Sequence, residues 1–339
     1  MKIKRNLRTR CFLPKKLLVT GSLAFDFIMD FPGKFSDHII PSKIHAINLS
    51  FLVSRINRQR GGTAGNIGYN LALLGVKPII LATAGNDFSD YRKFLESVGV
   101  DTSMVYIIKK GLTGRAFIFT DMVDNQITGF YPGAMKYAKE LSLKNKEIFS
   151  KFTMVIIAPN EPEAMINFAK ECQELGMDYL FDPGMQLPRL TDQDLRLGIE
   201  GAKIVIGNDY EIALIKKRLG KIPMYITYND RVLQHTSKSK VLITTLGEKG
   251  SIIESKGGKY EIPPAKPKAV LDPTGAGDAY RAGVLAGYLR GFPLGVCGKM
   301  GSVCAVYTVE KYGTTTHKFS IKQFCRRYKE NFKDETIQL

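Results

Sequence analysis

The residues best suited to chemistry lie in one short stretch, residues 272–278 with the sequence DPTGAGD, which leads directly into an apolar, helix-forming segment. Small residues let the backbone approach a ligand closely, and the free N–H groups at a helix N-terminus attract an anion. The pattern therefore predicts an anion hole formed by Gly275, Ala276 and Gly277. Asp278 falls in the first helical turn, where its carboxylate can take the proton of an attacking hydroxyl during phosphoryl transfer. The alternative is that Asp278 only caps an ordinary helix.

Three weaker motifs, at residues 61–66, 208–211 and 245–250, place small and polar side chains where a strand or helix is expected to begin or end. In the first, paired glycines open a helix and put Asn66 on the side of the turn. In the second, an amide and a carboxylate three residues apart share one helical face, and either organise a hydrated Mg²⁺ and a phosphate or simply cap the helix. The third is a glycine-containing turn that suits a nucleotide's ribose and phosphates, or a plain hairpin.

Short apolar runs alternate with helical patterns along most of the chain. The runs that read as buried strands are 17–20, 79–84, 154–158, 179–181, 204–206 and 241–244, and the helical patterns are 64–74, 90–97, 161–175 and 210–218. Such alternation predicts an α/β domain with a mostly parallel sheet covered by helices on both faces. Ligands in these folds bind at the carboxyl ends of the strands, so the motifs should meet there.

Two segments, about 31–60 and 112–130, break this alternation. They contain β-branched or alternating stretches, such as 44–49 and 116–121, without helical partners. We expect them to form a small antiparallel sheet that projects from a main domain spanning residues 17–339. Residues 1–16 carry seven basic and no acidic side chains, and we interpret them as a disordered basic tail rather than a targeting segment.

Composition excludes several classes of protein. The chain has 339 residues and 44% apolar residues, and no apolar run reaches the roughly 20 residues that a spanning helix needs. Five cysteines without a Cys-x-x-Cys pair, and four scattered histidines, argue for a reducing, cytoplasmic setting and against a zinc site. The net charge of +17 is spread along the chain without a nucleic-acid-binding motif, so we expect a basic solvated surface and neither a nucleic-acid nor a membrane partner.

Together and in this order, the four motifs resemble the ribokinase (PfkB) family of carbohydrate and nucleoside kinases, over about residues 17–316. Within that family the sequence looks most like bacterial adenosine kinases of the mycobacterial type, in segments 21–26, 31–36, 49–53, 130–135 and 208–211. The resemblance implies a ribokinase-like fold in which segments 31–60 and 112–130 form a β-lid, which in many relatives is also a dimer interface. It also implies transfer of the γ-phosphoryl group of ATP to the 5′-hydroxyl of adenosine, with Mg²⁺ as cofactor and Asp278 as base.

The resemblance also implies the remaining site residues. Those that would contact the nucleoside are Asp26 at the ribose hydroxyls, Gly62 and Asn66 at the sugar, and Ser22, Ser50, Phe130 and Gln186 in the surrounding pocket. Those that would hold ATP are Asn208, Thr245, Leu246, Gly247 and Gly250. Glu211 would act through Mg²⁺ and its waters, and Asp272 and Thr274 are suitably placed for a monovalent cation such as K⁺.

Two positions depart from the adenosine kinase pattern. The lid strand reads Ala116-Phe117 where close relatives carry an aromatic residue near Arg115, and Met185 precedes Gln186 where a second amide is expected. Both changes fall near the predicted acceptor pocket, so a sugar or sugar-phosphate kinase of the same family is the main alternative. A non-catalytic protein that binds nucleotides or nucleic acid is a second alternative, against which the complete Asp278 motif argues.

Overall fold

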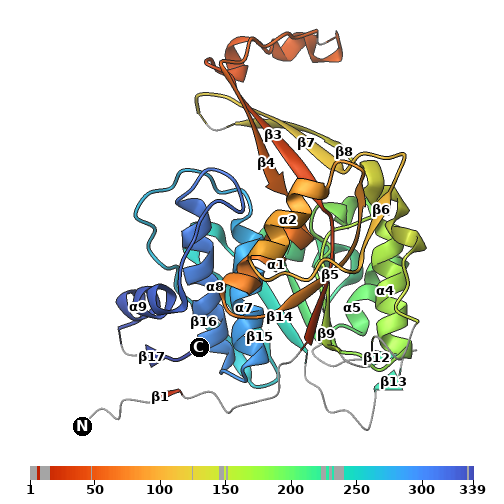
Figure 1. Ribbon diagram of the computed structural model, residues 1–339, viewed down its shortest axis with the longest axis vertical. Helices are drawn as coiled ribbons and strands as arrows, with labels where there is room; N and C mark the ends of the chain where they lie inside the picture. Colours follow the sequence, from red (N-terminus) through yellow and green to blue (C-terminus); the bar gives the residue numbers. More distant parts are fainter. Residues whose placement is uncertain are drawn as a thin grey trace.

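The computed structural model describes residues 6–7, 16–46, 48–123, 125–144, 149, 152–222, 227–228, 231–232, 240–333 and 336–339. Most of these residues belong to a large sheet covered by helices, and a smaller sheet stands beyond one edge of it (Figure 1). The predicted α/β architecture, with a mostly parallel main sheet and a small second sheet, is therefore confirmed.

The large sheet contains nine of the described strands, in the order β16-β15-β14-β11-β10-β9-β2-β5-β6. Their bounds are β2 Lys16–Thr20, β5 Pro78–Gly85, β6 Val105–Ile108, β9 Phe152–Ile157, β10 Tyr179–Phe181, β11 Ile204–Asn208, β14 Val241–Thr245, β15 Ser251–Ser255 and β16 Gly258–Ile262. The strands from β14 to β6 run parallel, whereas β15 and β16 pair antiparallel at the edge. All carboxyl ends of the parallel strands therefore meet at one edge of the sheet.

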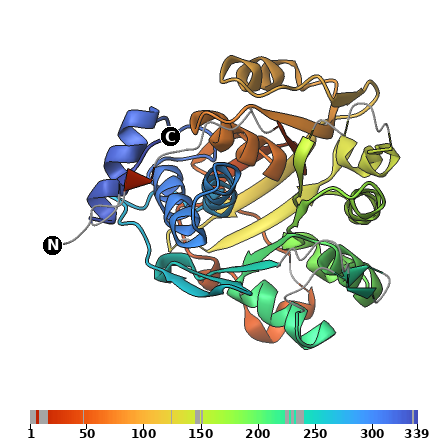
Figure 2. The same cartoon turned by 90° about the horizontal axis from the view of Figure 1, so that it is seen from below.

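Helices cover both faces of this sheet (Figure 2). Leu17 and Val19 of β2 join a core formed with helices α1 Thr63–Leu73, α2 Ser89–Ser97, α7 Ala276–Leu289, α8 Leu294–Val309 and α9 Ile321–Asn331. Leu18, which points to the other face, joins a second core formed with α4 Pro162–Glu174, α5 Asp192–Glu200 and α6 Asp209–Leu219. The strands are buried on both faces, which is why their sequences read as continuous apolar runs.

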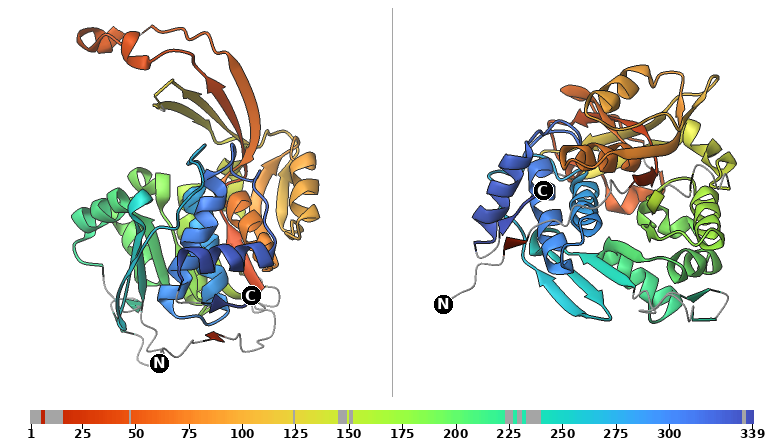
Figure 3. Two further views of the ribbon diagram at one scale, coloured as in Figure 1. Left: turned by 90° about the vertical axis from the view of Figure 1, so that its left-hand side faces the viewer. Right: turned by 60° about the horizontal axis from the view of Figure 1, so that its bottom comes forward.

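The small sheet lies beyond the carboxyl ends of the parallel strands (Figure 3). It has the order β4-β3-β7-β8, formed by β3 Ala24–Asp30, β4 Arg55–Gly61, β7 Gly114–Thr120 and β8 Gln126–Tyr131. Two of its pairings are antiparallel, but β3 and β7 run parallel, so the sheet is mixed rather than antiparallel as expected. Strand β3 follows directly on β2, and we call this sheet the lid sheet.

The predicted strands and helices of the large domain are confirmed to within two residues at each end. The lid differs, because β3 was not expected, and residues 44–46 and 48–49 are not part of a strand. Instead the 3₁₀ helix η2 spans Pro41–Ala46, beginning at a proline whose fixed φ suits the first position of a helical turn. Residue 47 and most of the basic tail lie outside the described residues, and Asn6–Leu7 pairs with Thr336–Ile337.

Two further expectations can be compared with the described residues. None of their helices combines the length and the apolar character needed to cross a bilayer. Four cysteines, Cys172, Cys297, Cys304 and Cys325, are free thiols, while Cys11 lies outside the described part of the chain. Within that part, no group of three or more histidine, cysteine, aspartate or glutamate side chains is arranged to hold a metal ion.

Candidate active site

Helix α7 begins at the carboxyl-end edge of the large sheet with Gly275 as its N-cap, and no described side chain caps it. Gly275 has a φ of 77°, and a Cβ there would lie 2.8 Å from Cγ2 of Thr314. A Cβ on Gly277 would likewise lie 2.7 Å from a guanidinium nitrogen of Arg281. Gly275 is therefore required by its backbone conformation and by the Thr314 loop, whereas at Gly277 the Arg281 side chain would have to move. The Ala276 N–H donates to the Pro273 carbonyl over 3.2 Å, so of the three N–H groups those of Gly275 and Gly277 are better placed to bind an anion.

The carboxylate of Asp278 lies half-buried in the first turn of α7 and is bound by a side chain from another helix. Nδ2 of Asn66, in the first turn of α1, donates to Oδ2 of Asp278 over 2.9 Å. Burial raises the pKa of Asp278 to about 6, against the opposing effects of the Arg281 charge and the Asn66 hydrogen bond. The group is therefore ionised at neutral pH yet close to titration, as a general base requires.

Behind Asp278 lies a buried ion pair between Arg281 and Asp182. The Nε atom of Arg281 is 2.5 Å from Oδ2 of Asp182, whose side chain is 1% exposed. Arg281 follows Asp278 by three residues, so both side chains leave α7 on the same face. Burial raises the pKa of Asp182, and Arg281 opposes this effect. Loss of either partner would leave an uncompensated buried charge.

Asp26, on strand β3, faces the same region from the side of the lid sheet. It is 8% exposed, and a Cβ on Gly61 of β4 would collide with its carboxylate, so Gly61 makes room for it. Burial raises the pKa of Asp26 to about 7, and the negative charges of Asp278 and Asp272 raise it further. These effects indicate that Asp26, Asp272 and Asp278 converge on one region between the two sheets.

The register of the lid sheet places one row of side chains on the face that carries Asp26. Asp26 pairs with Gln59 on one side and Ala116 on the other, and Ala116 pairs with Phe130. Paired residues of neighbouring strands share a face, and strands lie about 4.8 Å apart. The small side chain of Ala116 therefore separates Asp26 from the half-exposed ring of Phe130, leaving room for a flat group between them.

Ser22 and Gly62 hold the start of α1 beneath the lid. The Ser22 hydroxyl accepts the Thr63 N–H over 3.1 Å, and the Ser22 carbonyl accepts the Ala64 N–H. Gly62 has a φ of 87°, and a Cβ there would lie 2.6 Å from the Ser22 carbonyl oxygen. Both residues fix the helix that carries Asn66.

The predicted nucleotide-contacting residues lie along the same edge, on two neighbouring parallel strands. Asn208 at the end of β11 pairs in register with Thr245 at the end of β14. Asn208 and Glu211 form a reciprocal capping box at the start of α6, with both hydrogen bonds 2.8 Å long. The capping interpretation of this motif is thus correct, although it leaves the second carboxylate oxygen of Glu211 without a hydrogen bond to any described residue. Burial raises the pKa of Glu211, assisted by Asp182.

Residues 245–250 form the hairpin between β14 and β15, through the 3₁₀ helix η5 Gly247–Lys249. The Leu246 N–H donates to the Gly250 carbonyl over 2.8 Å. Gly250 has a φ of 89°, and a Cβ would lie 2.1 Å from the Ile262 carbonyl oxygen. The glycine at 250 is therefore demanded by the hairpin itself, whatever ligand lies beside it.

Asp272 joins two loops beside the start of α7. Its Oδ1 accepts the Thr274 N–H and its Oδ2 accepts the Gly313 N–H, each over 2.9 Å. The carboxylate thus holds the 313–316 loop against the glycine-rich turn that leads into α7. Asp272 is 8% exposed, and these two hydrogen bonds satisfy one lone pair on each of its carboxylate oxygens.

The remaining pocket residues are less closely tied to this cluster. Gln186 is buried in the 3₁₀ helix η4 Gly184–Arg189 and accepts a hydrogen bond from Arg189 over 3.1 Å. Ser50 is exposed in the segment before β4 and makes no hydrogen bond with any described site residue. Its neighbour Phe51 packs instead against Phe31 and Phe35 in an aromatic cluster of the lid.

Three residues of the cluster have no role in the sequence prediction: Asp182, Arg281 and Thr314. Asp182 ends a predicted strand, at the edge where ligands bind, and Arg281 lies within the glycine-rich motif. Their positions were therefore visible, but their pairing depends on the contact between β10 and α7. Thr314 comes from a loop without any distinctive pattern, and only the fold brings it to Asn66, 2.7 Å away.

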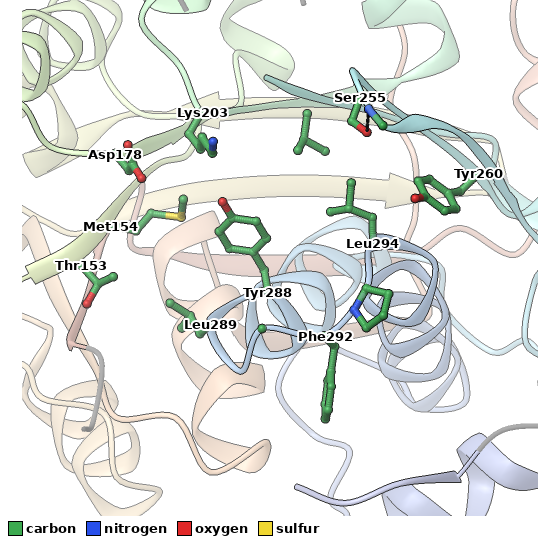
Figure 4. Close-up of a pocket in the computed structure, with 14 residues that line it drawn as sticks. Thr153, Met154, Asp178, Lys203, Ser255, Tyr260, Tyr288, Leu289, Phe292 and Leu294 are labelled. Atoms are coloured by element: carbon green, nitrogen blue, oxygen red, sulfur yellow. Dashed lines mark hydrogen bonds between the residues drawn. The ribbon is translucent and has the colours of Figure 1, made fainter. Parts of the chain in front are cut away.

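A cavity of about 560 Å³ lies at the opposite, amino-end edge of the large sheet (Figure 4). Its lining includes Met154, Asp178, Lys203 and Tyr288, and Tyr288 projects into its middle (Figure 4). Tyr288 lies in the last turn of α7, ten residues after Asp278, and therefore about 15 Å from it along the helix. We call this hollow the foot cavity, and none of the predicted site residues lines it.

Comparisons with known proteins agree with this geometry. Residues 16–320 match the pfkB family of carbohydrate kinases. A nucleoside kinase of Methanocaldococcus jannaschii is 33% identical over 89% of this chain and 93% of its own length. The structure of Burkholderia thailandensis nucleoside kinase in complex with inosine has a TM-score of 0.81 at 32% identity, covering 95% of this chain and all of that one. The structure of the same enzyme in complex with ADP-inosine has a TM-score of 0.78 at 33% identity, covering 94% of this chain and 97% of that one.

The match extends over nearly the whole described domain, and the glycine-rich turn, Asp278 and the lid sheet all fall inside it. The chain belongs to the pfkB family of carbohydrate kinases and is an ATP-dependent kinase.

Proposed function

We propose that this kinase transfers the γ-phosphoryl group of ATP to the 5′-hydroxyl of a purine nucleoside, with adenosine as the first candidate. The observation that carries the proposal is the half-buried carboxylate of Asp278, with its raised pKa, beside the uncapped start of α7. The choice of a nucleoside is supported by relatives that are named nucleoside kinases, one of them in complex with inosine.

In the proposed reaction Asp278 accepts the proton of the acceptor hydroxyl. The oxygen freed of its proton forms a bond to the γ-phosphorus, the bond from that phosphorus to the bridging oxygen breaks, and ADP leaves with that electron pair. The N–H groups of residues 275–277 would stabilise the negative charge on the transferred group. The guanidinium of Arg281, close to Gly277, would add a positive charge at the same point.

The acceptor would lie between the lid and α1. Asp26 is suited to bind the two ribose hydroxyls by charge-assisted hydrogen bonds, with Gly62 and Asn66 nearby. The base would lie beside Phe130, over the space that Ala116 leaves open in the row shared with Asp26. Gln186 and Ser22 would complete the inner wall, and Ser50 would reach the pocket only if the lid closes further.

ATP would extend along the neighbouring strand ends, over Asn208 and the hairpin of residues 245–250. Mg²⁺ in proteins often binds through one or two carboxylates together with waters and phosphates, so the single half-buried carboxylate of Glu211 fits a hydrated ion carried by ATP. That ion would neutralise charge between the phosphates. A monovalent cation beside Asp272 and Thr274 stays a prediction. Each carboxylate oxygen of Asp272 already accepts one N–H group, so such an ion would have to share these oxygens with the main chain.

The acceptor is tested by measuring ATP consumption and calorimetric binding with adenosine, inosine, cytidine, ribose and fructose 6-phosphate. We expect nucleoside-dependent turnover, and no turnover with 5′-deoxyadenosine, which keeps the ribose hydroxyls but lacks the attacking oxygen. Turnover with a sugar, in the absence of binding by any nucleoside, would contradict the proposal.

We also propose that two copies of the chain associate through the lid sheet. The lid face opposite Asp26 exposes an apolar group, with Ile56 62%, Phe117 38% and Ile127 43% exposed. Such a contiguous apolar face suits association with another protein surface. Light scattering should give the mass of two chains for the wild type and of one chain for Ile127→Lys. A single-chain mass for the wild type at micromolar concentration would refute this arrangement.

A further inference from the structure

Asn66 and Thr314 connect Asp278 to the main chain of β4 through one continuous line of hydrogen bonds. Nδ2 of Asn66 lies 2.9 Å from Oδ2 of Asp278, and Oδ1 of Asn66 lies 2.7 Å from the Thr314 hydroxyl. The same hydroxyl lies 2.8 Å from the Arg60 carbonyl oxygen. Asn66 is 4% exposed and Thr314 is 2% exposed, so water does not readily enter the contact between these two side chains.

The number of hydrogen atoms that can be donated within this line limits how its side chains can be oriented. The Thr314 hydroxyl has one hydrogen but faces two acceptors, the Asn66 Oδ1 and the Arg60 carbonyl, and can satisfy only one. If the Asn66 amide turned by 180°, its NH₂ group would donate to Thr314, and the hydroxyl would be free to donate to Arg60. The amide oxygen would then face Asp278, which is favourable only when Asp278 carries a proton.

We propose that Asn66 and Thr314 are positioning residues that couple the orientation of the Asn66 amide to the proton on Asp278. With Asp278 ionised, the amide donates to the carboxylate and Thr314 donates to the amide oxygen. When Asp278 has taken the proton of the acceptor hydroxyl, the amide turns, so that all three donors in the line have acceptors. The turned line would stabilise the protonated base that the reaction produces. This inference rests on the proposed role of Asp278 as base.

The backbone that carries Asn66 is fixed from behind by a second pair of side chains. Nδ2 of Asn70 donates to the Asn66 carbonyl over 2.9 Å, and Oδ1 of Asn70 lies 2.8 Å from Nε2 of His317. His317 is 1% exposed, and burial lowers its pKa to about 4, so it stays neutral above pH 5. The amide group of Asn66 can therefore turn on a fixed backbone, without a titrating neighbour at this end.

Other charged and titratable groups also face Asp278. Arg281 extends from the same helix, Asp182 from the end of β10, Asp26 from β3 and Tyr91 from α2. Arg281 favours the ionised form of Asp278, whereas Asp182 disfavours it. None of these groups is altered by a substitution at residue 66 or 314, so they provide a constant background against which the hydrogen-bonded line can be tested.

The test compares the acid limb of the pH profile of kcat/KM for the nucleoside in Thr314→Val, in Asn66→Ala and in the double variant. Thr314→Val removes one hydrogen bond from the ionised state but two from the protonated state. We therefore expect its midpoint to fall by about half to one pH unit. Thr314→Ser, which keeps the hydroxyl, should retain the wild-type midpoint. In the Asn66→Ala background the line is already broken, so adding Thr314→Val should produce no further shift.

A midpoint that stays or rises in Thr314→Val would overturn the inference, and so would an equal shift in both backgrounds. Variants that turn over too slowly are titrated by ¹³C NMR of the Asp278 carboxyl carbon, which needs no activity. The same NMR titration separates this inference from the proposed function. If Asp278→Asn keeps full turnover, the base assignment fails, whereas unshifted NMR midpoints refute only the hydrogen-bonded line.

Discussion

The carboxyl-end edge and the amino-end edge of the large sheet differ in what they bury. At the carboxyl end, burial raises the pKa of Asp26 to about 7 and that of Asp278 to about 6. The charge of Asp278 adds to the effect on Asp26, and the charge of Asp182 adds to the effect on Asp278. At the amino end the foot cavity offers about 560 Å³ but is lined largely by apolar and aromatic side chains, with Tyr288 in its middle. Helix α7 runs from one region to the other, and its first turn faces the acidic cluster.

This difference shows that the size of a hollow does not locate the chemistry in this molecule. Titratable groups whose pKa values are displaced by burial and by specific neighbours mark functional sites better than volume does. Buried carboxylates also destabilise the fold when ionised, so their retention at the carboxyl end requires a compensating use.

The largest expected effect follows from Asp278→Asn, which removes the proposed proton acceptor while keeping the size of the side chain. We expect kcat to fall by about 10²–10⁴ with nucleoside binding retained. The matched control is Asp178→Asn at the foot cavity, for which kcat should stay within about twofold of wild type, since Asp178 lines the foot cavity at the opposite edge of the sheet. Equal losses in both variants would remove the distinction between the two ends.

The next largest effect should come from Arg281→Met, measured by chemical denaturation at pH 7. This change leaves Asp182 buried without its partner, which should cost about 3–5 kcal/mol of unfolding free energy. The double variant Arg281→Met with Asp182→Leu should recover much of that stability but not the rate. Recovery of both would mean that Arg281 serves the fold alone.

Asp26→Asn should make the protein more stable in a pH-dependent way. The pKa of Asp26 is raised from 3.8 to about 7 in the fold, so the ionised side chain opposes folding, fully above pH 7 and progressively less as the pH falls toward 4. The variant should therefore gain up to about 4 kcal/mol at pH 8 and almost nothing near pH 4. Unfolding measured at both pH values checks the sign, and a constant gain would show that the charge is not the cause.

The smallest effect compares two glycines with nearly equal φ angles at the two ends of α7. Gly275→Ala introduces strain at a φ of 77° and a contact 2.8 Å from Thr314, whereas Gly291→Ala, at 75°, meets no atom within 4 Å. We expect losses of about 2–3 kcal/mol and about 1 kcal/mol respectively, read from thermal unfolding. Equal losses would indicate that the Thr314 loop gives way easily.

The sequence was a good guide to the large domain and a partial guide to the site. Apolar runs such as 154–158 predict buried strands well, because a parallel sheet covered on both faces leaves little freedom in residue type. The 272–278 motif predicted the start of α7 and the position of Asp278 in its first turn. The lid was less predictable, since the parallel pairing of β3 with β7 depends on contacts between residues about 90 positions apart in the sequence.

Site residues that depend on long-range contacts were the ones missed. The pairing of Asp182 with Arg281 joins residues 99 positions apart, and the contact of Asn66 with Thr314 joins residues 248 positions apart. No local periodicity encodes such pairs, because each partner is locally compatible with many environments. The capping box of Asn208 and Glu211 illustrates the reverse case, where a local motif was readable but carried two interpretations at once.

The central claim is that phosphoryl transfer takes place at the carboxyl-end edge, with Asp278 as the base. A crystal structure with a bound nucleoside and a non-hydrolysable ATP analogue tests it most directly. We predict that the acceptor hydroxyl lies within about 2.6–3.2 Å of the Asp278 carboxylate, with the terminal phosphate over residues 275–277. A nucleoside bound in the foot cavity, or a hydroxyl beyond hydrogen-bonding reach of Asp278 and closer to another base, would contradict the claim.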